Sequence, residues 1–158
     1  MCEAARMTEV IFRAAVRADV PAIVALLADD EFGAAREAVS EEVDAAYWRA
    51  FDALDGDPRN TVIVAESAGT VVGTMQLIVI PSLSRRGTQR LEIEGVRVAS
   101  THRGAGLGRR MIGWAVDEAR AQGCKLVQLT TDKRRVDARR FYESLGFTAT
   151  HEGMKLPL

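Results

Sequence analysis

The sequence predicts an α/β domain whose core is a mixed, mostly antiparallel sheet. β-Branched runs alternate with stretches of helical periodicity, a short glycine-containing turn joins two of these runs, and a glycine-rich turn precedes the clearest amphipathic helix. With 158 residues, of which 47% are hydrophobic and 27% charged, the chain is long enough to bury a core. We therefore expect residues 1–158 to form a single domain.

The N-terminal part is predicted to contribute one strand and two helices. Residues 10–16 form a strand-like run, and Asp19 followed by Pro21 is a helix-start signal before an apolar segment. Ser40, with two glutamates directly after it, is expected to cap the second helix. The apolar residues of that helix recur at helical spacing as far as Leu54.

Three strands are expected next. Residues 61–66 and 70–79 are β-branched runs separated by a short turn, which predicts a hairpin. Residues 90–98 alternate between apolar and charged side chains and form the third strand. Gly95 interrupts this strand, which indicates a β-bulge.

The C-terminal part begins with the glycine-rich turn, residues 103–108. An amphipathic helix over residues 109–122 follows it, and residues 126–130 form a further strand. A short helix then ends at Gly146, which suits the position after a helix C-terminus. Residues 147–158 are expected to supply one or two final strands.

The charge distribution is informative, although the formal net charge is only -1 and indicates no polyanionic partner. Residues 1–57 carry 13 acidic and 5 basic side chains, whereas residues 58–158 carry 9 acidic and 16 basic ones. This asymmetry fits either solvated helix faces of opposite sign or a site that takes a cationic substrate and a phosphate-bearing cofactor.

Cysteine, histidine and hydropathy patterns exclude several classes of protein. The two cysteines, Cys2 and Cys124, predict no disulfide framework, and we expect Cys124 to be a core residue. His102 and His151 are far apart in the sequence, so no metal site is expected. The chain has neither an export signal nor a membrane-spanning run, which predicts a cytoplasmic protein without a membrane partner.

The glycine-rich turn is the most specific functional feature. Backbone N–H groups at such a turn, together with the following helix N-terminus, form a seat for phosphate. A Walker loop is excluded because Gly108 is followed by Arg109 and Arg110. A dinucleotide fingerprint is excluded because the next strand, residues 126–130, carries no acidic residue.

Two motifs together indicate a family. The turn reads Arg-x-x-Gly-x-Gly after a strand, and a Phe-Tyr-x-x-x-Gly-Phe segment, residues 141–147, follows about forty residues later. In these motifs the chain resembles the GCN5-related N-acetyltransferase (GNAT) superfamily, over almost its whole length. The resemblance implies a sheet of six to seven strands, splayed between the fourth and fifth, with about four flanking helices.

The resemblance also implies which residues bind acetyl-CoA, the expected acyl donor. Backbone amides of the turn would hold its pyrophosphate, from Arg103, Gly104, Ala105, Gly106, Leu107 and Gly108. Main-chain groups of Val96 and Val98 would hold the pantetheine arm. Arg109 either assists or is simply solvated. Asp137 stands where relatives commonly have an asparagine that contacts the cofactor, so its role is in doubt, and it could instead cap its helix.

Catalysis would require a base, because an alkylammonium with a pKa of about 10 has no lone pair at neutral pH. Glu92 and Glu94 share one face of their strand, and neighbouring carboxylates raise each other's pKa. Glu94 matches the base position of many relatives, with Glu92 as helper; the alternatives are an exposed charged face and ordered water as base. Tyr142 matches the general-acid position, where the alternative is a core tyrosine.

The sequence therefore predicts direct acetyl transfer from acetyl-CoA to a primary amine of a small molecule or peptide, in a ternary complex. Acidic residues within 29–44 would border the acceptor site and favour a cationic amine. The alternatives are a macromolecular acceptor, namely a protein N-terminus or an aminoacyl-tRNA, and a non-catalytic acyl-CoA-binding regulator. We expect no nucleic-acid partner. We also expect edge strands near the C-terminus, through which two subunits could pair as a homodimer.

Overall fold

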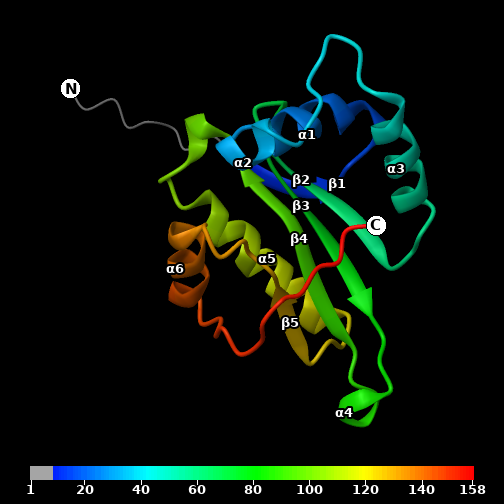
Figure 1. The fold of residues 1–158 in the computed structure, drawn as a ribbon, viewed down its shortest axis with the longest axis vertical. Helices are drawn as coiled ribbons and strands as arrows, with labels where there is room; N and C mark the ends of the chain where they lie inside the picture. Colours follow the sequence, from blue (N-terminus) through cyan, green and yellow to red (C-terminus); the bar gives the residue numbers. More distant parts are fainter. Residues whose placement is uncertain (1–8) are drawn as a thin grey trace.

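A five-stranded sheet forms the centre of the computed structural model, which describes residues 9–158. The strands follow chain order across the sheet (Figure 1): β1 (Val10–Ala14), β2 (Asn60–Ser67), β3 (Thr70–Ile80), β4 (Arg90–Val98) and β5 (Leu126–Leu129). The first three pairs are antiparallel, and β4 and β5 are parallel. The mixed, mostly antiparallel sheet is therefore confirmed.

Within residues 9–158, six helical segments accompany the sheet: α1 (Val20–Leu27), α2 (Glu31–Ala34), α3 (Ala45–Asp55), α4 (Ser84–Gly87), α5 (Leu107–Ala121) and α6 (Val136–Ser144). Single 3-10 turns precede α1 and α5. Four of the helices have eight residues or more. None of the helices in the described part is both long and apolar enough to cross a membrane.

Two hydrophobic clusters lie on opposite faces of the sheet. The larger one joins the sheet to α5, where Leu91, Ile93 and Met111 are fully buried. The smaller one joins the other face to α1 and α3, around Val64 and Phe51. The apolar half of the alternating pattern in β4 thus faces α5, which leaves the carboxylates of that strand on the side of α1 and α3.

β4 changes its pairing in the middle. On its β3 side, Thr74 pairs with Arg97 and Gln76 with Glu94, so β4 has one extra residue at this point. Gly95 lies there with a positive φ of 59°, which confirms the predicted bulge. On its other side, pairing with β5 ends at Ile93 and Leu129, so the second half of β4 has an open edge there.

The predicted number of strands is wrong in two respects. In the described part of the chain the sheet has five strands rather than six to seven, and residues 147–158 contain no strand. Gly153 and Pro157 interrupt this segment, and a proline cannot donate to a strand ladder. All of its side chains after Phe147 are exposed, so burial does not select a register.

The structure also bears on the predicted start of the second helix and on the two cysteines. Helix α3 does not start near Ser40 but at Ala45, because the Asp44 carboxylate accepts a 2.7 Å hydrogen bond from Ala46 N. Cys124 is a free, half-buried thiol packed against the larger cluster. The prediction for Cys2 lies outside the described residues.

Candidate active site

The glycine-rich turn lies between β4 and α5. Gly104 and Gly106 have φ of 78° and 80°, a left-handed backbone that glycine adopts without strain. Among residues 9–158, no backbone acceptor bonds the N–H groups of residues 104–109. Helix α5 adds its positive dipole end at Leu107. Five predicted pyrophosphate-binding residues therefore present unpaired amides, an arrangement that fits a diphosphate group.

Arg103 has a bracing function in the structure. Its Nε donates to Val98 O at 3.0 Å, and its Nη2 donates to Asp29 O and Oδ2 at 2.6 and 3.0 Å. Asp29 Oδ2 also accepts Ser100 N at 2.9 Å. The Arg103 side chain thus connects the end of β4 to the loop after α1, and its own amide bonds Ser100 O at 3.4 Å.

The start of α5 packs against α6, as Figure 1 shows. A Cβ on Gly108 would lie 3.3 Å from Phe141 Cζ, so glycine allows the close approach of the two helices. Arg109 Nη2 donates to Ser144 Oγ at 3.3 Å, which ties the same pair of helices together. Asp137 is an exposed residue in the first turn of α6, but the N-cap is Arg135, so the alternative of a capping role is wrong.

The open edge of β4 contains Val96 and Val98, both half-buried. Val96 O accepts a 2.8 Å hydrogen bond from Arg97 Nη1, and Val98 O accepts Arg103 Nε. Their carbonyl groups are therefore bonded by side chains rather than by a neighbouring strand. This is the edge from which β5 has separated, where an extended ligand could add main-chain hydrogen bonds.

The two carboxylates of β4 lie close together but have different surroundings. Glu92 is buried and accepts a hydrogen bond from Gln128, its register partner on β5. Glu94 is exposed at the bulge. Its side chain is open to solvent, but neighbouring protein atoms remove part of the hydration of the carboxyl group. This partial desolvation and the proximity of Glu92 raise the pKa of Glu94, and Lys155 opposes this increase. The pairing of the two glutamates on one face is as predicted.

Tyr142 is half-buried in α6, next to the larger cluster. Its ring makes edge-on contacts with Phe141 and Phe147, with centroids 5.1 and 5.9 Å apart. Burial raises the pKa of Tyr142, and the positive charges of Arg97 and Arg135 oppose this increase. The phenol therefore keeps its proton at neutral pH, so it can donate one.

An ion-pair network that the sequence did not reveal lies next to Tyr142. Arg135 donates to Asp30 Oδ2 and Oδ1 at 2.8 and 3.2 Å, and Arg97 Nε lies 3.5 Å from Asp30 Oδ2. Burial raises the pKa of Asp30, but Arg135, the amide of Gly33 and Arg97 outweigh it and hold the value at about 2. The partners are 105 residues apart, so no local pattern could have indicated them.

These contacts also explain part of the charge asymmetry. Asp29 and Asp30 are bonded to arginines of this chain, and Glu37 accepts a 2.8 Å hydrogen bond from the Tyr47 hydroxyl. Asp44 caps α3. Much of the acidic segment 29–44 is therefore engaged within the molecule rather than available to a cationic ligand.

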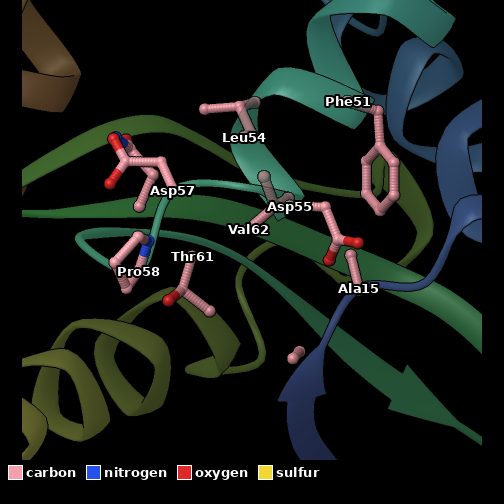
Figure 2. A pocket seen from close by; sticks show the side chains of 10 residues that line it. Ala15, Phe51, Leu54, Asp55, Asp57, Pro58, Thr61 and Val62 are labelled. Carbon is pink, nitrogen blue, oxygen red and sulfur yellow. The ribbon is translucent and has the colours of Figure 1, made fainter.

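Two adjoining cavities lie on the face of the sheet that carries Glu94. The α1/α3 cavity has about 150 Å³, and its mainly apolar lining includes Val20, Ile23, Val24, Leu27, Ala50 and Gln76. The outer cavity, of about 240 Å³, lies at the end of α3 and contains Asp57 and Asn60 (Figure 2). Both cavities share Phe51, Leu54 and Val62. Sequence reasoning missed Gln76, whose only signal was its polarity in an apolar strand.

Comparison with known proteins shows the family of the chain. The model of the acetyltransferase (GNAT) family matches residues 21–147. A glucosamine 6-phosphate N-acetyltransferase of Trypanosoma brucei brucei is 35% identical over 97 residues, which are 61% of this chain and 64% of that protein. The match thus covers less than two thirds of the relative.

Solved structures extend the likeness to nearly the whole chain. A transcriptional regulator from Bacillus halodurans C-125 is 43% identical with a TM-score of 0.92, over 95% of this chain and 100% of that one. A Trypanosoma brucei acetyltransferase is 25% identical with a TM-score of 0.74, over 95% and 100% of the two chains. The protein thus has the GNAT fold, and it belongs to the acetyltransferase (GNAT) family.

Proposed function

We propose that this chain transfers an acetyl group from acetyl-CoA to a primary amine of a small molecule or peptide, and that residues 1–158 form one N-acetyltransferase domain. The observation that carries the proposal is a row of unpaired amides, residues 104–109, close to an open strand edge and a carboxylate of raised pKa. Membership of the family supports the same conclusion.

The residues have separate tasks in this proposal. The turn amides, from residue 104 to Arg109, hold the pyrophosphate, and the edge of β4 at Val96 and Val98 holds the pantetheine arm. An amide of this edge also stabilises negative charge on the acetyl oxygen. The acyl donor supplies a thioester, which is more reactive toward amines than an amide or an ester.

Two side chains move protons. Glu94, assisted by Glu92, takes a proton from the acceptor ammonium, and its raised pKa makes it a better base than an ordinary glutamate. Tyr142 gives its proton to the departing sulfur. A carbon–nitrogen bond thereby replaces a carbon–sulfur bond. The acceptor ammonium loses two protons in total: one passes to solvent through Glu94, and the other, lost from nitrogen after the attack, restores the proton that Tyr142 gave to the sulfur.

A thiol-release assay tests this function. Acetyl-CoA is offered with polyamines, aminoglycosides, amino acids and peptides, using the native chain, Glu94→Gln, and Asp117→Asn as an exposed control on α5. We expect amine-dependent thiol release that Glu94→Gln reduces about 100-fold and Asp117→Asn leaves unchanged. The function is refuted if no amine stimulates release above the hydrolytic background.

One observation favours a second candidate, an acyl-CoA-binding regulator. The solved structure with 43% identity is described as a transcriptional regulator. A regulator would bind CoA through the same turn but release no thiol. Calorimetric titration with CoA, run beside the thiol assay, separates the two functions because only the enzyme shows both binding and turnover.

A further inference from the structure

Three polar side chains form a relay from the outer cavity to the α1/α3 cavity. Asn60 Nδ2 donates to Asp57 Oδ2 at 2.6 Å, and Gln76 Nε2 donates to Asn60 Oδ1 at 2.8 Å. Hydrogen bonds from Arg59 N and Asn60 hold the pKa of Asp57 below its ordinary range. Asp57 is thus an anion that only accepts hydrogen bonds.

The relay fixes the orientation of both amide groups. Because Asp57 only accepts, Asn60 must present its NH₂ group to Asp57 and its oxygen to Gln76. Gln76 must then use its NH₂ group toward Asn60, which leaves its Oε1 as an acceptor. Within residues 9–158, no donor is hydrogen-bonded to Gln76 Oε1, although Gln76 lines the α1/α3 cavity.

Gln76 and Glu94 lie opposite each other in the β3–β4 register, so their side chains share a face of the sheet. Directly paired residues of antiparallel strands have Cβ atoms about 5 Å apart. The site therefore offers a carbonyl oxygen and a carboxylate side by side. A primary ammonium or amine, which carries several N–H groups, satisfies both acceptors at once.

The rest of the α1/α3 cavity offers little to a polar ligand. Thr74 Oγ1 donates to Ile63 O at 3.0 Å, and the Tyr47 hydroxyl is bonded to Glu37 and to Ala38 N. Its other lining side chains are apolar. An apolar cavity of about 150 Å³ accommodates a benzene-sized group.

We propose that the acceptor is a primary amine attached to a small apolar group, of about the size of benzylamine or isobutylamine. Its nitrogen is held between Gln76 Oε1 and Glu94, and its apolar part fills the α1/α3 cavity. Asn60 and Asp57 are positioning residues that hold the Gln76 carbonyl in place. The proposal rests on the acetyl-transfer function and narrows its substrate class.

A steady-state comparison of amines tests the cavity. We expect kcat/KM for benzylamine and isobutylamine to exceed that for ethanolamine and spermidine at least 10-fold. Ala50→Leu, which places a larger side chain in the cavity from an exposed position, should raise KM for benzylamine at least 10-fold. Ala53→Leu, on the same helix but outside the cavity lining, should not change it.

Two further variants test the relay of Asp57, Asn60 and Gln76. Gln76→Leu should raise KM for benzylamine at least 10-fold with a smaller change in kcat, and Asn60→Leu should raise it about 3-fold to 10-fold. KM for acetyl-CoA should stay the same in both. Gln89→Leu removes a glutamine that bonds Gln122 O away from the cavity, and it should leave both constants unchanged. Thermal melts confirm that each variant is folded.

The outcomes separate this inference from the general function. Turnover that prefers ethanolamine or spermidine, or an Ala50→Leu variant with unchanged KM for benzylamine, overturns the inference and leaves acetyl transfer intact. If no amine is turned over, acetyl transfer fails, and NMR titration of the CoA-bound protein with benzylamine still tests the cavity. Shifts at Ile23 and Ala50 would support an apolar amine site, and their absence would overturn it.

Discussion

Glu94 combines features that a base requires and that an ordinary surface glutamate lacks. It is open to solvent, yet neighbouring protein and Glu92 raise its pKa. Glu92 is buried and bonded to Gln128, so it remains beside Glu94. The bulge at Gly95 directly follows, which places the carboxylate where β4 leaves β5.

The pH dependence of kcat/KM should report on Glu94. A base works only when deprotonated, so activity should decrease as the pH falls through its pKa, which lies above the ordinary value of 4.5. Glu92→Gln removes a neighbouring charge and should move this limb to lower pH. Lys155→Met removes a stabilising cation and should move it to higher pH. Shifts in the opposite directions would exclude Glu94 as the titrating group.

Tyr142→Phe should lower the rate of the chemical step about 100-fold, because the departing sulfur loses its proton donor. The substitution keeps the ring contacts with Phe141 and Phe147, so thermal stability should change little. Single-turnover kinetics measure this step. Phe141→Leu is the comparison variant, because it alters the neighbouring ring but removes no proton donor. If the rate of the chemical step is unchanged in Tyr142→Phe, the only role of the tyrosine is packing.

At the scale of elements, the turn before α5 forms the proposed cofactor site, and the Asp30 network connects α2 to the start of α6. The turn depends on backbone conformation at two glycines. The network depends on a carboxylate that reaches from the N-cap of α2 to Arg135 beside α6. The turn therefore responds to substitution of its glycines, whereas the Asp30 network responds to a change of charge or pH.

Gly106→Ala should weaken cofactor binding. An L-residue in the left-handed region costs about 1–2 kcal/mol, which corresponds to a roughly 5-fold to 30-fold rise in KM for acetyl-CoA if the turn relaxes away from its geometry. Gly113→Ala is the control, in the helix that follows the turn, at an exposed position with open space around it. It should stabilise the fold by about 1 kcal/mol and leave KM unchanged.

Asp30→Asn should destabilise the protein at neutral pH. The folded-state pKa of about 2 lies below the ordinary value of 3.8, so the carboxylate contributes about 2 kcal/mol above pH 4. This contribution is lost as the pH falls toward 2. Urea melts at pH 7 and pH 3 should therefore show a smaller difference from the native chain at pH 3. Asp55→Asn, at an exposed position, should show no such difference.

At the scale of the whole molecule, the sheet ends in a short strand with an open outer edge, and an extended tail follows α6. Within the described residues, β5 pairs with β4 alone. Met154, Leu156 and Leu158 are 85% or more exposed. In Figure 1 the tail passes back across the sheet, and Lys155 is close enough to lower the pKa of Glu94.

We propose that two copies of the chain pair through this tail and the β5 edge, where the exposed apolar side chains would be buried. Light scattering after size exclusion should give twice the mass of one chain. Removal of residues 153–158 should give a monomer, whereas Ile11→Ser, which changes an exposed residue of β1 at the opposite edge of the sheet, should not. A monomeric native chain at micromolar concentration would refute this.

Local patterns predicted much of the architecture because they reflect local physics. The hairpin, the Gly95 bulge and the buried face of β4 follow from residue spacing and were predicted correctly. The strands expected within residues 147–158 were not predicted correctly, because no side chain after Phe147 is buried to select a strand register. The Asp30 network joins residues 105 positions apart, and the role of Gln76 depends on strand register, so neither was evident from local patterns.

The glycine-rich turn has a consequence for how its sequence can change over time. Its amides are supplied by the main chain, so no single side-chain deletion removes them. The turn requires two torsion angles, at Gly104 and Gly106, and the absence of a side chain at Gly108, whereas the exposed Ala105 can change. Distant descendants could therefore share this turn with little resemblance between their side chains.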